Sequence, residues 1–320
     1  MPARPASDAS AIGFARPGVA LLLALLGVCA GFALAKPVFL SPDNLVSILH
    51  QIAIIGIMAM GMTFVIVTGG IDLSIGPVLA IAGVIAADVL DGTAGNAVLA
   101  VCVALSACAA IGAINGLLIA RAGLAPFVVT LAALSIVRGV ALLMGGADLH
   151  LIRGPPSFIA IGSGVVAGVP FSVFVFAATV VVATFAQYGT TFGMSMQAIG
   201  ANPRAARLSG LRVRSVKSVA YIVSAISAGI AGIIQASQVH TAAATYGMGV
   251  ELDVIAAVVV GGASLSGGSG SVLSTTVGVL LIGVTNNGLG LLNTPIEWQL
   301  IAKGLIIVIA LGFGVRREGL

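Results

Sequence analysis

Long apolar segments fill most of this 320-residue chain, and short polar or glycine-rich stretches separate them. A helix needs about 20 residues to cross the hydrocarbon core of a bilayer, so apolar segments of this length indicate membrane spans. Two of the segments are shorter, which is typical of half-length or broken helices. The pattern predicts an all-α protein, a polytopic transmembrane bundle of about ten spans: 18–35, 45–68, 77–90, 96–120, 124–144, 169–187, 219–239, 251–262, 272–292 and 296–313. Residues 145–168 are expected as a loop, and residues 241–249 as an external loop.

The chain is expected to consist of one membrane domain and two tails. Residues 1–17 are polar and include three prolines, as in a disordered tail on the cytoplasmic side. The transmembrane domain is expected at 18–314, and residues 315–320 form a short cytoplasmic C-terminal tail. The first apolar segment ends with Ala-Leu-Ala before Lys36, a pattern that cleaved signal peptides also show. Because many spans follow it, a retained helix is the favoured interpretation.

The composition supports a membrane protein. Hydrophobic residues make up 59% of the chain and charged residues only 8%, whereas a soluble domain carries about 25% charged residues. An even number of spans places both termini on the same side, and ten of the fourteen Lys and Arg residues lie on that side, which identifies it as cytoplasmic. The positive charges therefore set membrane orientation, and together with the few aromatic residues they argue against a nucleic-acid partner.

The densest basic stretch, residues 192–217, contains a short helix signal. Asn202 is a good N-cap, Pro203 suits the first helical position, and Gly210 suits the helix end. No acidic residue occurs in the range 149–250 to balance the positive charge. We expect this helix to dock a partner on the cytoplasmic side, although the basic residues also have a simpler role in setting orientation. These residues are Arg204, Arg207, Arg212, Arg214 and Lys217.

A glycine motif occurs twice in the chain. The pattern Gly-Gly-x-x-Leu-Ser-x-Gly is found at 69–76 and again at 261–268, and Asn-Gly-Leu at 115–117 recurs at 287–289. Duplicated breaks in apolar segments point to a transport site. In a chain with 43 glycines such a similarity also arises by chance, so both interpretations stay open.

No enzymatic motif is present in the sequence. The chain lacks the phosphate-binding loop GxxxxGK[ST], the metalloprotease pattern HExxH and a nucleophile elbow. The histidines and cysteines share no spacing that suits a metal. We therefore expect no catalytic, cofactor-binding or metal-binding residues.

Several polar residues fall at membrane depth, where a charged side chain costs roughly 2.5–3.5 kcal/mol at a helix centre. Such residues usually face a cavity or a partner, which makes them candidates for a translocation pathway. Acids at span ends also serve as helix caps or complement the helix dipole, and asparagines also link helices. The candidates are Asp72, Asn115, Arg138, Glu251, Asp253, Asn286, Asn287 and Gln299.

Five blocks of the sequence, in their order and spacing, make residues 45–311 similar to the ribose/xylose/galactose-type permease family of ABC importers. The blocks are GMTFVIVTGGIDLSIG at 61–76, APFVVTLAALSIVRGVAL at 125–142, PSFIAIGSGVVAGVP at 156–170, AIGANPRAARLSGL at 198–211 and GMGVELDVIAAVVVGGASLSGGSG at 247–270.

This resemblance implies an inner-membrane permease for a monosaccharide, with no cofactor in this chain. ATP and Mg are then bound by a cytoplasmic ATP-binding cassette ATPase, and a periplasmic or extracellular sugar-binding protein delivers the sugar. A second permease copy or a homologue completes the transporter. The resemblance also implies a coupling loop at 188–218, whose ATPase-coupling residues are Asn202, Arg204, Ala205, Ala206, Arg207, Ser209 and Gly210.

Two alternatives share these sequence features. A branched-chain amino-acid permease of the same superfamily has the same architecture. An ion-driven secondary transporter would use Asp72 or Glu251 as a proton or cation site. A purely structural membrane scaffold would leave the broken helices unexplained.

Overall fold

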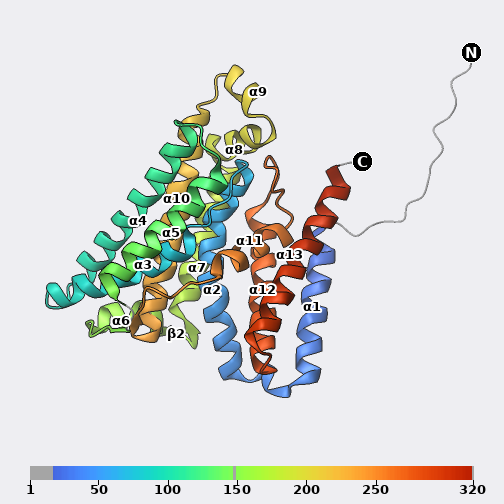
Figure 1. Cartoon of the computed structure of the whole chain (residues 1–320). Coiled ribbons are helices and arrows are strands. Elements are labelled where there is room, and N and C mark those ends of the chain that lie inside the picture. The colour runs from blue at the N-terminus through green and yellow to red at the C-terminus, as the bar shows by residue number, and fades with distance from the viewer. Residues whose placement is uncertain (1–16, 147–148, 319–320) are drawn as a thin grey trace, which may run out of the picture.

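The computed structural model describes residues 17–146 and 149–318, which are helical apart from loops and four two-residue strands (Figure 1). Seven of the described helices are long and apolar enough to cross a membrane, and Val19–Ala35 is a shorter apolar helix. The all-helical, multi-span fold is thus confirmed. The helices are α1 (Pro17–Ala35), η1 (Pro37–Leu40), α2 (Pro42–Val67), α3 (Ile75–Gly92), α4 (Ala97–Ala120), α5 (Pro126–Gly145), α6 (Pro156–Ser163), α7 (Phe171–Tyr188), α8 (Thr191–Ala201), α9 (Pro203–Leu208), α10 (Val213–Val239), α11 (Val250–Val260), α12 (Val272–Leu291) and α13 (Ile296–Glu318).

Each of the ten expected spans corresponds to one helix, namely α1 to α5, α7 and α10 to α13. The short segment expected at 77–90 is longer in the structure, because α3 starts two residues earlier and ends at Gly92. The expected N-terminal tail lies outside the described residues except for Pro17. At the other end, α13 continues as a helix through Glu318, past the expected end of the membrane domain.

Helix α10 is the central helix of the bundle and packs against α2, α3 and α4. Small residues allow these close approaches. A Cβ built on Gly112 or Gly116 of α4 would come within 2.6–2.7 Å of the α10 backbone, at Tyr221 and Ser218. Such contacts between small residues are how helices pack in lipid, where the apolar solvent supplies no driving force.

The first apolar helix is part of this bundle. Helix α1 packs against α12, where the Phe32 ring lies directly over Gly288. Next to this contact, Asn44 at the start of α2 and Asn287 of α12 exchange two side-chain hydrogen bonds of 3.0 and 2.9 Å.

The segment expected as a loop at 145–168 carries more structure than its composition indicates. It contains α6 and the strands β1 (His150–Leu151) and β2 (Val165–Val166), and β2 pairs with β3 (Val169–Pro170). Strand β1 pairs with β4 (Thr241–Ala242), which follows α10. Together α6 and β2 lie at the end of the molecule opposite to α8 and α9 (Figure 1).

The expected loop at 188–218 is largely helical, which corrects the sequence interpretation. Helix α8 occupies 191–201, a segment without charges that the sequence analysis treated as loop. Helix α10 begins at Val213, so Arg214 and Lys217 belong to its first turns. Only α9 corresponds to the short helix predicted from the cap signals.

Candidate coupling and translocation sites

Helix α9 projects from one end of the bundle and is closed by the expected cap (Figure 1). The Asn202 side-chain oxygen accepts the backbone N–H groups of Arg204 and Ala205 at 3.1 and 3.0 Å. Gly210 follows the helix with a φ of +82°, a conformation that glycine adopts without strain. Ala206 is the buried residue of α9 and packs with Ile199 of α8.

The outer surface of α9 is basic and carries one large apolar side chain. Arg204 and Arg207 are exposed, and Leu208 is 90% exposed. The one ion pair among the described residues is Lys303–Asp253. Arg204 and Arg207 of α9 therefore have no ion-pair partner within this part of the chain. Such a charged surface with an apolar anchor suits a protein partner with an acidic groove.

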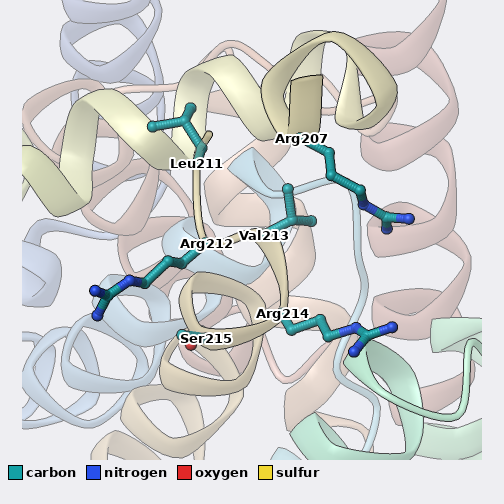
Figure 2. Close-up of a pocket in the computed structure, with 6 residues that line it drawn as sticks. All are labelled: Arg207, Leu211, Arg212, Val213, Arg214 and Ser215. Atoms are coloured by element: carbon teal, nitrogen blue, oxygen red, sulfur yellow. The ribbon is translucent and has the colours of Figure 1, made fainter. Parts of the chain in front are cut away.

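A pocket of about 310 Å³ lies between α9 and the first turn of α10 (Figure 2). In Figure 2 the side chains of Arg207 and Arg214 extend toward the same side, while Arg212 extends the opposite way. The sequence analysis placed Arg207 in the coupling set but did not include Leu208 or this pocket. The pocket is lined by Arg207, Leu211, Arg212, Val213, Arg214 and Ser215.

Residues 241–249, here called the re-entrant segment, turn back into the bundle, which corrects their interpretation as an external loop. Ala242, buried like the two alanines after it, lies beside Gly83, and Gly247 packs on the carbonyl of Gly76. Seven residues of α3 separate these two contacts, which corresponds to about 10 Å along the helix. Helix α11 then begins inside the bundle as a half-length helix.

Arg138 of α5 holds the re-entrant segment from the side. Its guanidinium donates to the carbonyl oxygens of Ala244 and of Tyr246, the latter at 2.7 Å. These carbonyls belong to non-helical backbone, whose own hydrogen bonds are a strand pairing and isolated turns. Arg138 therefore supplies hydrogen bonds that a helix would otherwise make internally.

The start of α11 carries two acids, and one of them is paired. Lys303 of α13 lies 2.9 Å from both carboxylate oxygens of Asp253, and Asn286 of α12 donates to Asp253 Oδ2 at 3.1 Å. Glu251 is half-buried, and its Oε2 lies against Gly76 without a hydrogen-bond partner. Both acids occupy the first turn of α11, where negative charge complements the helix dipole.

Asp72 and Asn115 lie in a separate, closed network. Asp72 Oδ1 accepts the backbone N–H of Ser74 at 3.0 Å and its hydroxyl at 2.5 Å, and Oδ2 accepts the Ser224 hydroxyl at 2.9 Å. Asn115 of α4 donates to the Ser74 hydroxyl at 3.0 Å. Asp72 is fully buried, so in this conformation the network faces neither lipid nor an open pathway.

The remaining two candidates are also engaged. Asn287 forms the reciprocal pair with Asn44, and Gln299 donates to the Thr294 carbonyl at the start of its own helix. The structure thus unites Asp253 with Asn286, and Asp72 with Asn115, but not all eight candidates. Among the described residues no cluster of His, Cys, Asp or Glu suits a metal ion.

Comparison with known proteins agrees with this architecture. Residues 44–311 match the family described as "Branched-chain amino acid transport system / permease component". The ribose import permease protein RbsC of Escherichia coli (strain K12) is 39% identical over 292 residues, 90% of this chain and 91% of the relative. RbsC of Bacillus subtilis (strain 168) is 40% identical, over 87% of this chain and 86% of its own length. The L-arabinose ABC transporter permease protein AraH of Azospirillum brasilense is 33% identical, over 93% of this chain and 87% of its own length. No solved structure matches this chain.

These matches confirm the permease family expected from the sequence and extend over nearly the whole chain. A permease subunit is not catalytic, and an ABC importer also contains an ATPase and a binding protein. The match leaves no place for the ion-driven secondary transporter. The chain belongs to the family of ABC-importer permease components, as a multi-pass membrane subunit.

Proposed function

We propose that this chain is the permease of an importer for a monosaccharide of the ribose, arabinose or allose type. The family description mentions branched-chain amino acids, but the relatives reported above are named for ribose and arabinose, and a further relative, 32% identical, for D-allose. These relatives match the chain almost from end to end. That support favours a sugar over an amino acid as the transported molecule.

The observation that carries the coupling role is the capped, basic and outward-facing helix α9. Its exposed arginines and Leu208 offer charge and an apolar anchor to an ATPase, which binds the ATP and Mg for which this chain has no motif. We assign the exposed members of the expected coupling set to this contact, while Ala206 is buried and holds α9 on α8. The start of α1 and the end of α13 point toward the same end of the molecule as α9, so both termini are cytoplasmic in this proposal (Figure 1).

The proposed sugar pathway lies beside the re-entrant segment. Thr245 is exposed and Met248 is 71% exposed, although the segment lies inside the span of the bundle. Non-helical backbone at membrane depth is tolerated only against protein or a water-filled cavity, so this face does not contact lipid. A second permease copy opposite this face would enclose a sugar pathway between the two copies.

We assign the pathway to Arg138, which holds the re-entrant segment, to Glu251 and Asp253 of α11, and to Asn286 and Gln299 on the helices α12 and α13 that contact α11. A broken helix beside such polar groups is the arrangement in which transporters place their substrates. Asp72, Asn115 and Asn287 belong to closed networks between helices. We assign a structural role to these three.

Uptake into proteoliposomes tests the proposal. The chain is reconstituted with the ATPase and the binding protein that co-purify with it, and labelled ribose, arabinose, allose and leucine are compared with and without ATP. We expect ATP-dependent uptake of at least one of the sugars and none of leucine. Uptake of leucine alone would replace the sugar assignment by an amino-acid one.

A further inference from the structure

The two copies of the glycine motif meet in space, beside the end of α8. Gly69 of the first copy, Gly267 and Gly268 of the second copy and Gly200 of α8 form this contact, which we call the glycine junction. Helices α2, α8 and α12 are therefore linked through backbone atoms at the end of the molecule that carries α9 (Figure 1). The internal similarity in the sequence thus marks two segments that pack against each other.

One inter-segment hydrogen bond lies at the centre of the glycine junction. The Gly268 N–H donates at 2.9 Å to the carbonyl of Val67, the last residue of α2, which has no partner within its own helix. Gly200 lies directly on this bond, because a Cβ there would overlap the Val67 oxygen and the Gly268 nitrogen. A Cβ on Gly267 would come within 2.8 Å of the Gly69 Cα.

Side chains from the end of α7 fix residues 270–272, which follow the second motif and lead into α12. Gln187, only 2% exposed, donates to the Gly270 carbonyl at 2.7 Å and accepts the Val272 N–H at 2.9 Å. Tyr188 donates its hydroxyl to Ser271 at 2.9 Å. Helices α7 and α8 therefore hold the start of α12 by side-chain bonds as well as by the junction.

The glycine junction is immediately connected to the proposed coupling helix. Gly200 is the second-last residue of α8, and Asn202, which caps α9, follows two positions later. The α8–α9 unit is short and tied together by Ala206 and Ile199. A displacement of α9 therefore moves Gly200 against the end of α2 and against the second motif.

We propose that Gly200 and Gln187 are positioning residues for transport, which link the position of α9 to α2 and, through the two motifs, to α3 and α12. The inference rests on the proposed docking of an ATPase at α9. In this arrangement one movement at the cytoplasmic end reaches both glycine motifs at once. The helices that follow the motifs, α3 and α12, contact the re-entrant segment and half-helix α11 respectively.

Gly200→Ala tests the link, with Gly27→Ala as the matched control. Gly27 is a helical glycine of α1 with open space around its Cα. The assembled transporter in proteoliposomes is assayed for ribose, arabinose and allose uptake and for ATP hydrolysis in the same sample. We expect uptake per ATP hydrolysed to fall about tenfold in Gly200→Ala, as loss of a coupling free energy predicts, and to stay unchanged in Gly27→Ala.

A second variant keeps the test decisive if Gly200→Ala fails to assemble. Gln187→Ala removes both bonds to the residues that follow the second motif, Gly270 and Val272. Thr179→Ala on the same helix removes only a bond to its own helix backbone. The same loss of uptake per ATP is expected for Gln187→Ala and not for Thr179→Ala. An unchanged ratio in the assembled Gly200→Ala, or in Gln187→Ala, would overturn the inference. Absence of ATP-driven uptake in the unmodified transporter would instead reject the proposed function.

Discussion

Two buried carboxylates in this protein are satisfied in different ways. Asp72 has hydrogen-bond donors from Ser74 and Ser224, and no ion pair to it occurs among the described residues. It precedes α3, where the helix dipole also favours a negative charge. Asp253 has a cationic partner, Lys303, on another helix. The first arrangement fixes the break between α2 and α3 and joins it to α10, and the second joins α11 to α13.

The ion pair at Asp253 predicts a large effect of removing one partner. The two side chains are 7% and 18% exposed, and breaking a buried pair costs about 3–5 kcal/mol because the remaining charge stays buried. Lys303→Met should therefore lower the free energy of unfolding by about that amount, measured by denaturant unfolding in detergent. The double variant with Asp253→Asn, which keeps an acceptor for Asn286, should recover most of the loss. A single variant as stable as the unmodified protein would contradict this role.

Arg207→Glu tests the docking role of α9 at a single exposed position. Reversing the charge should abolish sugar-stimulated ATP hydrolysis by the assembled transporter, since an acidic groove of the partner would repel the new carboxylate. The spans should keep their stability within about 0.5 kcal/mol, as is usual for surface substitutions. Unchanged sugar-stimulated hydrolysis would reject this role for Arg207.

At the scale of elements, local signals decided what the sequence could predict. The short helix α9 was predicted because its cap and its terminal glycine are encoded within nine residues. Helix α8 was missed because its segment carries no charge and follows α7 after two residues, although Thr190 at its N-cap is a typical capping residue. The re-entrant segment was assigned outside the bundle because its small residues and glycines resemble a loop. Only its contacts with α3 and Arg138 place it inside.

The environment of the re-entrant segment can be tested by thiol labelling. Met248→Cys and Ile136→Cys, each in a background without the three native cysteines, place a thiol on two exposed positions, 71% and 65% exposed. A water-soluble reagent should label the thiol at 248 quickly and the thiol at 136 slowly, because only a hydrated thiol forms the reactive thiolate. Equal, slow labelling in native membranes would show that position 248 faces lipid or a dry interface.

For the whole molecule, hydropathy predicted a helical bundle with many spans, because each helix must satisfy its backbone within the bilayer. Ten spans were expected, and seven of the described helices are long and apolar enough to cross a membrane. The pairing of the helices was not predictable in this way. Contacts between residues far apart in the chain bring the two glycine motifs together and join Gln187 to the residues after the second motif. The one local signal of the contact with Gly270 and Val272 was the side-chain amide of Gln187 at the end of an apolar segment. Of the eight pathway candidates, the sequence could not separate those near the re-entrant segment from those in closed networks.

The most direct test of the transporter assignment is purification of the tagged chain from its native membranes in mild detergent. We predict that an ATP-binding cassette ATPase co-purifies in stoichiometric amount and that Arg207→Glu and Leu208→Asp each reduce its recovery. A preparation that holds the chain without any ATPase, under conditions that preserve its fold, would contradict the assignment of α9 as the coupling element.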